Sequence, residues 1–381
     1  MIPLAIPNMS GNEAKYLNEC IEMNFVSSVG PFVDRLEEMV AEATGAEASV
    51  VTSSGTDGLH VALLALGVQP GDLVIVPSYT FIASANAVRH CGADPWLIDV
   101  DAYSWTLDPD LLEQMLASET VKRDGHLYHF ESNQKVSAIV VVYTLGLPAD
   151  MDRIVEIAKA YDLPVIADAA AALGATYKNR QLAEHGADVA VFSFNGNKTV
   201  TAGGGGSVIA RDPDVLAKIK HITTTARVSD AYDHDVVGFN YRMTNLQAAV
   251  GCAQMELLDD FVAAKRRIAQ RYNAALSGIE GVSAFPEPTW AQSACWFSGV
   301  LLSISMKNVS EYISALRACE IGARPFWKPM HLQRPYKNMF SSTMTVTDDI
   351  WSRILTLPCS TNLTDEEQEF VISSFMNLTK A

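Results

Sequence analysis

The alternation of short apolar runs with helical patterns over about the first 250 residues constrains the fold more than any other feature. The runs are rich in Val, Ile and Ala and lack a polar face, which is typical of strands buried on both sides. Helical segments separate them, such as 55–66, where Leu59, Leu63 and Leu66 share one face. Strands joined by helices form a mainly parallel sheet with helices on both faces. We therefore predict an α/β fold.

Ligands of such sheets bind beyond the carboxyl ends of the strands, where the connecting loops lie. We predict one strand that ends near Thr52 and further strands within 72–80, 94–101, 136–144, 164–170 and 188–194. The rule then selects the loops 53–56, 78–81, 143–146, 168–171 and 193–198 as places to search for functional side chains.

The rest of the chain indicates a second, smaller unit. A polar stretch, 118–135, resembles a surface hairpin, although a plain loop is the simpler interpretation. Residues 238–278 have a long helical pattern that could link two domains. From about Val282 onward, strand-like and helix-like segments follow each other. We expect a large α/β domain over 1–250, including an N-terminal arm, and a smaller α+β domain over 251–381.

Composition excludes several classes of function. The 44 acidic residues outnumber the 28 basic ones, and no Lys/Arg block stands out, so we expect no nucleic-acid partner. No apolar stretch approaches the roughly 20 residues of a membrane span, and residues 1–17 lack the pattern of a signal peptide. We expect a cytoplasmic protein without a membrane contact. The six cysteines are far apart, which favours reduced thiols and no metal site.

Lys198 lies in the small-residue stretch "SFNGNKTVTAGGGG", residues 193–206. A solvated loop lysine is the simplest interpretation. A nucleotide-binding P-loop is disfavoured because Asn197 precedes the lysine and Phe192 stands where the first glycine would fall. The third interpretation is a lysine whose amine forms a Schiff base with a carbonyl compound or with pyridoxal phosphate. This interpretation predicts companion residues elsewhere in the chain.

Those companions follow other predicted strands. Asp168 supplies the acid that a pyridine nitrogen needs if the ring is to act as an electron sink. Gly55 and Thr56 open a helix, where backbone N–H groups and a hydroxyl can bind a phosphate. Phe81 offers an aromatic face, and glycines 203–206 let the chain turn behind the lysine. Each signal is weak alone, but together they favour pyridoxal phosphate as the cofactor.

The sequence resembles the DegT-like sugar-nucleotide aminotransferases, which have the fold type I of pyridoxal phosphate enzymes. The resemblance covers essentially the whole chain and rests on four motifs. They are "SSGTDGLHVALLALGVQPGDLVIVPSYTFIASANAV", "IADAAAALGATYKNR", "FSFNGNKTVTAGGGGSVIA" and "GFNYRMTNLQAAVG".

The resemblance implies a role for each motif residue. Lys198 would bind the cofactor covalently, Asp168 would pair with the pyridine nitrogen and Phe81 would stack on the ring. The phosphate would be held by Gly55, Thr56 and Ser193, with Asn240 reaching in from the neighbouring subunit. The resemblance therefore also implies a homodimer with shared active sites.

Two positions depart from the family pattern. Many relatives have Gln, His or Glu where this chain has Ala171, and many have His where it has Tyr143. Both changes put the substrate contacts in doubt without removing the mechanism. A related branch of sugar dehydratases has His in place of the lysine, and Lys198 argues against that branch.

The substrate is indicated by the segments 24–45, 118–135 and 323–338, which resemble the subgroup of the legionaminic acid and bacillosamine pathways of bacterial surface glycans. That subgroup aminates carbon 4 of a UDP-linked 4-keto-6-deoxy-N-acetylhexosamine with L-glutamate, by ping-pong kinetics through pyridoxamine phosphate. Contacts to the sugar or the diphosphate are expected from Arg242, Arg324, Trp327 and His331. Packing at a domain boundary is the alternative role for Trp327.

Two other functions remain open from the sequence. One is amino transfer to carbon 3 of a keto sugar or to a cyclitol by the same family. The other is a pyridoxal phosphate-binding regulator without catalysis, which the acidic charge and the lack of a helix-turn-helix segment disfavour.

Overall fold

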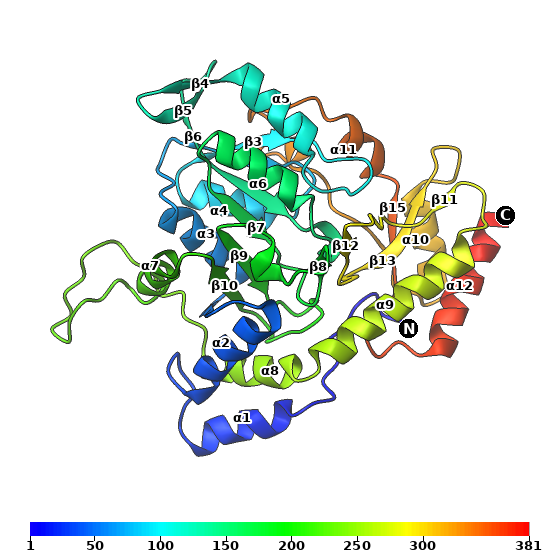
Figure 1. Cartoon of the computed structure of the whole chain (residues 1–381). Helices are drawn as coiled ribbons and strands as arrows, with labels where there is room; N and C mark the ends of the chain where they lie inside the picture. The colour runs from blue at the N-terminus through cyan, green and yellow to red at the C-terminus, as the bar shows by residue number, and fades with distance from the viewer. Residues whose placement is uncertain (381) are drawn as a thin grey trace.

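The computed structural model of the chain describes residues 1–380, and a nine-stranded sheet forms its centre (Figure 1). Seven strands follow the order β1-β10-β9-β7-β6-β2-β3, and the hairpin β4-β5 joins the sheet through β6. The seven are β1 (Val50–Thr52), β2 (Leu73–Pro77), β3 (Asp94–Ile98), β6 (Lys135–Val142), β7 (Val165–Asp168), β9 (Val189–Ser193) and β10 (Gly206–Ala210).

The pairing within this sheet is mainly parallel, as predicted. Strands β3, β2, β6, β7 and β9 run parallel, whereas β10 and β1 are antiparallel to their neighbours. Gly206 of β10 lies opposite Ser193 of β9, so the chain from 194 to 205 leaves the sheet and returns to the same point. The loop that contains Lys198 is therefore anchored at both ends.

Helices cover both faces of the sheet because alternate strand residues enter two separate cores. Ile139 and Val141 of β6 face one core, and Val140 and Val142 face the other. The helices over the second face are α3 (Gly55–Ala65), α4 (Ile82–His90) and α7 (Pro213–Thr223). Those over the first face are α2 (Pro31–Thr44), α5 (Pro109–Glu119), α6 (Met151–Ala160) and α8 (Asn245–Met255), and α1 (Glu13–Glu22) lies against α8. The α/β prediction is confirmed.

The hairpin expected within 118–135 is also confirmed. It consists of β4 (Thr120–Arg123) and β5 (His126–His129), and β5 pairs with the beginning of β6. The insertion thus extends the central sheet.

A second sheet of four short strands lies in the C-terminal part of the chain. Its order is β11 (Val282–Ser283), β13 (Ser298–Leu302), β15 (Ile354–Leu357) and β14 (Arg324–Pro325), all antiparallel. The helices α9 (Leu258–Leu276), α10 (Val309–Ala318) and α12 (Asp365–Lys380) pack with it. The remaining elements are α11 (Thr345–Ile350), the strand pair β8 (Thr176–Tyr177) and β12 (Ala291–Gln292), and three short 3-10 helices (Thr144–Gly146, Leu182–Glu184 and Met330–Leu332).

Two details differ from the simple pattern expected from the sequence. The single helical run over 238–278 is two helices, α8 and α9, with a break at 256–257. The first residues of the chain lie against the second sheet, because Ile2 bridges to Ile321 and Leu4 accepts a hydrogen bond from the N–H of Cys359. The division at residue 250 stays a prediction.

Within residues 1–380, no helix has the length and apolar character needed to cross a membrane. The same residues contain no group of three or more His, Cys, Asp or Glu side chains arranged to hold a metal ion.

Candidate active site

A cavity of about 450 Å³ lies where the carboxyl ends of the parallel strands meet β14 and the segment before β13. All five loops selected from the sequence contribute to its lining. The cavity brings together eight of the predicted site residues, namely Gly55, Thr56, Phe81, Asp168, Ser193, Lys198, Arg324 and Trp327. Asn240, Arg242 and His331 do not line it. The strand-end rule therefore located the cavity correctly.

The amine of Lys198 lies over the indole ring of Trp296, with Nζ 3.6 Å from the ring centroid. Burial of the amine lowers the pKa of Lys198 to about 8, and the negative charge of Asp168 opposes this shift. A lysine near its pKa at neutral pH can lose its proton and act as a nucleophile or a base. These properties separate Lys198 from an ordinary loop lysine.

A consequence of this lowered pKa can be tested on the cofactor-free protein. The rate at which Lys198 reacts with acetic anhydride should rise about tenfold per pH unit up to about pH 8 and then level off, since only the neutral amine reacts. Exposed Lys178 provides an internal control, because its hydrogen bond to Asp152 raises the pKa of its amine. Competitive labelling followed by peptide mass spectrometry measures both rates. A Lys198 rate that still climbs at pH 10 would contradict the assigned environment.

Asp168 ends strand β7, and its buried carboxylate is held from two sides. The hydroxyl of Ser84 donates to Oδ2 at 2.6 Å, and the backbone N–H of Ala170 donates to Oδ1 at 3.2 Å. Thr80 lies 2.7 Å from the Ser84 hydroxyl and continues this network. Burial raises the pKa of Asp168, an effect that the Ser84 bond and the charge of Lys198 reduce. A protonated ring nitrogen beside this carboxylate would stabilise its charge.

The start of α3 forms a concave anion site. The N–H groups of Gly55 and Thr56 belong to the first helical turn and have no intrahelical acceptor, and both residues line the cavity. A Cβ atom at Gly55 would lie 3.1 Å from Cβ of Ser193, and one at Gly206 would lie 2.7 Å from the Gly55 nitrogen. The glycines therefore allow three segments to meet closely around a space that fits a phosphate.

These residues together fit pyridoxal phosphate. Lys198 offers a reactive amine, Asp168 offers a buried carboxylate and the α3 terminus offers a phosphate cradle. Phe81, which is 55 % exposed and borders the cavity, offers an aromatic face.

Trp296 is a site residue that the sequence did not indicate. Its indole N–H donates to the carbonyl of Asn197 at 2.7 Å, and the two residues are 99 positions apart in the chain. The buried amine of Lys265 donates to the carbonyl of Trp296 at 3.0 Å, which fixes the tryptophan from behind. Trp296 therefore connects the second sheet to the Lys198 loop.

Trp327 lines the cavity and packs against other aromatic side chains, and a substrate contact by Trp327 stays a prediction. It stacks on Phe326 with ring centroids 4.3 Å apart, and it lies 6.0 Å from Trp296 and 6.3 Å from Phe81. Arg324 is exposed at the rim of the same cavity. The aromatic wall with one cation at its edge suits a sugar attached to an anionic diphosphate.

The three predicted residues outside the cavity have other surroundings. The Arg242 guanidinium donates to Oδ1 of exposed Asn240 at 3.3 Å, and Arg242 bridges to Thr52 at the edge of the sheet. The two ring nitrogens of His331 lie 2.7 Å from the hydroxyl of Ser78 and 2.9 Å from the carboxylate of Asp348. Both nitrogens of His331 are thus engaged within the chain, and a substrate contact by His331 stays a prediction.

The two departures from the family pattern both lie in the cavity lining. Ala171 contributes no polar side chain. The hydroxyl of Tyr143 lies 3.1 Å from Nδ1 of His185 in the protein interior. Neither position offers the polar group that many relatives have there, so the cavity depends on its other residues for polar contacts.

Comparison with known proteins gives a consistent family. Residues 7–376 match the model of the DegT/DnrJ/EryC1/StrS aminotransferase family. EpsN of Bacillus subtilis, assigned as a pyridoxal phosphate-dependent aminotransferase, is 38% identical over 99% of this chain and 95% of its own. A GDP-perosamine synthase of Caulobacter vibrioides is 36% identical over 98% of this chain and 97% of its own.

A solved structure agrees with these relatives. The crystal structure of a DegT DnrJ EryC1 StrS aminotransferase from Brucella abortus superposes with a TM-score of 0.88. It is 29% identical in sequence and covers 97% of this chain and 96% of its own. The similarity extends over both sheets.

Proposed function

This chain belongs to the DegT/DnrJ/EryC1/StrS aminotransferase family, and we propose that it transfers the amino group of L-glutamate to carbon 4 of a UDP-linked 4-keto-6-deoxy-N-acetylhexosamine. As a member of this family it is a pyridoxal phosphate-dependent sugar aminotransferase. The observation that carries the proposal is the position of Lys198 beside buried Asp168 in one cavity with an anion cradle. We further propose that the reaction takes place in the cytoplasm and serves a bacterial surface glycan.

Lys198 and Asp168 have the chemical roles in this proposal. Bound pyridoxal phosphate supplies an electron sink that stabilises the negative charge formed when an amino acid loses its α-proton. The carboxylate of Asp168 would hold the ring nitrogen protonated, and Ser84 keeps that carboxylate in place. The neutral amine of Lys198 would take the α-proton of glutamate and later deliver a proton to carbon 4 of the sugar.

In this proposal the two substrates bind one after the other in the cavity that contains Lys198. Glutamate binds first and leaves as 2-oxoglutarate, and the keto sugar then enters the same space, which gives ping-pong kinetics. Gly55, Thr56 and Ser193 would keep the cofactor phosphate bound throughout. Arg324 and Trp327 would contact the sugar nucleotide at the rim.

We propose a homodimer in which Asn240 and Arg242 complete the neighbouring active site. Part of the segment between α7 and α8, residues 224–244, extends away from the body of the molecule (Figure 1), whereas Arg242 bridges to Thr52 of β1. Several large apolar side chains are exposed on this segment, in the last turn of α1 and just after α1, which is unusual for a free surface. They are Ile21, Met23, Phe25, Val26, Val29, Val228, Tyr232, Val236 and Val237.

Mixed dimers test this shared site. Lys198→Ala and Asn240→Ala, each of low activity alone, should together regain about one quarter of the wild-type rate, because half the dimers are mixed and each contains one intact site. Activity is measured after the two variants are mixed, denatured and refolded together. Wild type treated in the same way is the control. A mixture no more active than its components would refute the shared site.

A GDP-linked sugar is the second candidate substrate, because one of the relatives is a GDP-perosamine synthase. Kinetics with glutamate and a panel of UDP- and GDP-linked 4-keto-6-deoxy sugars separate the two candidates. The proposal predicts that kcat/KM is highest for the UDP-linked N-acetylhexosamine and falls at least about tenfold without the N-acetyl group. A preference for a GDP-linked sugar would favour the second candidate, and transfer only to a 3-keto sugar or a cyclitol would overturn both.

A further inference from the structure

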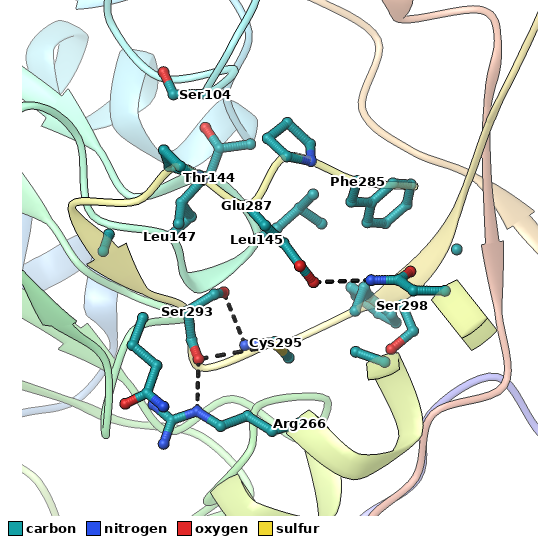
Figure 2. Close-up of a pocket in the computed structure, with 18 of the residues that line it drawn as sticks. Ser104, Thr144, Leu145, Leu147, Arg266, Phe285, Glu287, Ser293, Cys295 and Ser298 are labelled. Carbon is teal, nitrogen blue, oxygen red and sulfur yellow. Dashed lines mark hydrogen bonds between the residues drawn. The ribbon is translucent and has the colours of Figure 1, made fainter. Parts of the chain in front are cut away.

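A second cavity, of about 230 Å³, has a lining of its own (Figure 2). It is enclosed by the turn 144–147, the middle of α9 and the segment 285–299. Phe297 borders both cavities, but neither Lys198 nor Asp168 lines this one. It is therefore a separate space from the proposed reaction site.

Arg266 of α9 contributes a cation to this cavity. Its Nε donates to the carbonyl of Ser293 at 2.9 Å and its Nη2 donates to the carbonyl of Gly174 at 2.7 Å. Within residues 1–380, Nη1 has no hydrogen-bond partner and the guanidinium forms no ion pair. Burial lowers the pKa of Arg266, and the charge of Asp259 opposes this shift. A half-buried guanidinium of this kind favours a bound carboxylate.

Glu287 contributes the opposite charge to the same cavity. Its Oε1 accepts a hydrogen bond from the side chain of Asn273 at 2.8 Å. Among the described residues Oε2 has no partner, and the carboxylate forms no ion pair. Glu287 is exposed, and both it and Arg266 belong to the lining of this cavity, as Figure 2 shows with the segment of Ser293 and Cys295 between them in the view. The lining of the cavity thus contains a carboxylate, Glu287, that can bind a cation and a guanidinium, Arg266, that can bind an anion.

Other parts of the cavity lining are apolar, and two of its residues have strained backbone conformations. Leu145, Phe285 and Phe297 supply its apolar surface. Leu145 and Cys295 have φ values of 61° and 51°, in the left-handed region that non-glycine residues adopt at a cost of about 1–3 kcal/mol. The N–H of Trp296 donates to the carbonyl of Leu145 at 3.0 Å, and the N–H of Cys295 donates to the hydroxyl of Ser293 at 2.9 Å, so hydrogen bonds hold both turns. Strain retained in this way is typical of binding sites.

Two buried hydroxyls in the cavity lining also lack hydrogen-bond partners that a bound ligand could supply. The hydroxyls of Thr144 and Ser298, two residues of the cavity lining, are buried and have no hydrogen-bond partner in the described chain. Buried hydroxyls without partners cost free energy, and native proteins contain few of them.

We propose that this cavity binds a small α-amino acid, with its carboxylate on Arg266 and its amino group on Glu287. The volume of about 230 Å³ has room for a small amino acid. A simple anion would be repelled by Glu287, and a simple amine would be repelled by Arg266. A zwitterion satisfies both groups, and its side chain can pack against Leu145 and the two phenylalanines.

L-Proline is a suitable probe because its secondary amine cannot form a neutral Schiff base with a cofactor on Lys198. Cyclopentanecarboxylate has the same ring and carboxylate but lacks the amine, and pyrrolidine lacks the carboxylate. Titration calorimetry on the cofactor-loaded enzyme should show one proline per chain and binding of either analogue that is at least about tenfold weaker.

Two variants locate the binding. Glu287→Gln keeps the oxygen that accepts from Asn273 but removes the negative charge. Proline should therefore bind this variant about tenfold more weakly than it binds the wild type, and no more tightly than cyclopentanecarboxylate binds the variant. Arg324→Gln changes the rim of the other cavity and should leave proline binding unchanged. The proposal is overturned if L-proline does not bind saturably, if the analogues bind equally well, or if Arg324→Gln weakens proline binding and Glu287→Gln does not.

Discussion

Replacement of Lys198 by alanine is expected to lower kcat for amino transfer by a factor of about 10⁴ or more. The substitution removes the amine that binds the cofactor and the group that carries the proton between the substrates. No neighbouring amine in the cavity can replace it, since Lys198 is the only lysine in the lining described for residues 1–380. The rate is measured with glutamate and the keto sugar at saturating cofactor.

Two controls keep this result specific. Lys198→Arg retains the positive charge but cannot bind the cofactor covalently, so it should be as inactive as the alanine variant. Lys178→Ala removes an exposed lysine paired with Asp152 and should retain the wild-type rate. Thermal unfolding of each variant shows that the fold is intact. A Lys198→Ala variant within tenfold of the wild-type rate would refute the assigned role.

Replacement of Asp168 by asparagine should lower the rate of amino transfer by about 10³-fold and weaken cofactor retention. Asparagine has the same shape and can still accept the hydrogen bond from Ser84, but it cannot stabilise a protonated ring nitrogen. The loss therefore isolates the charge of Asp168 from its packing. It is measured as kcat together with the cofactor content after gel filtration.

Ser84→Ala is the matched control for this second variant. It removes the 2.6 Å hydrogen bond that positions the carboxylate but leaves the charge, so a loss of only about tenfold is expected. Equal losses in Asp168→Asn and Ser84→Ala would show that geometry, and not charge, is what the site requires. Unchanged kinetics in Asp168→Asn would refute its pairing with the ring.

The sequence located the candidate site because the relevant information is local. The strand ends that place Asp168 and Lys198 are marked by apolar runs, and parallel strands bring those ends to one edge. Gly55 is recognisable because a helix start with a small residue is a local pattern. The fold class and the hairpin within 118–135 were predicted correctly for the same reason.

Features that depend on long-range packing could not be predicted. Trp296 contacts Lys198 from the segment just before β13, and no pattern near Trp296 indicates that contact. The antiparallel pairing of β10 depends on the chain returning to Ser193, and the apolar run of β10 is compatible with either direction. His331 was a candidate because its loop is basic and aromatic, and no local pattern indicated that its ring contacts Ser78 and Asp348.

The family membership also excludes one of the functions that the residues left open. A regulator without catalysis is excluded, because the chain is a pyridoxal phosphate-dependent sugar aminotransferase of this family over nearly its full length. The family does not fix the nucleotide or the position of the new amine, so these depend on Arg324, Trp327 and the partner subunit in the proposal.

The central claim is that Lys198 holds a cofactor which takes an amino group from glutamate and gives it to a keto sugar. An absorbance spectrum of the purified protein with pyridoxal phosphate tests this claim most directly. We predict a visible band that disappears when glutamate is added and returns when UDP-4-keto-6-deoxy-N-acetylglucosamine follows. A band that never forms, or one that glutamate leaves unchanged, would contradict the account.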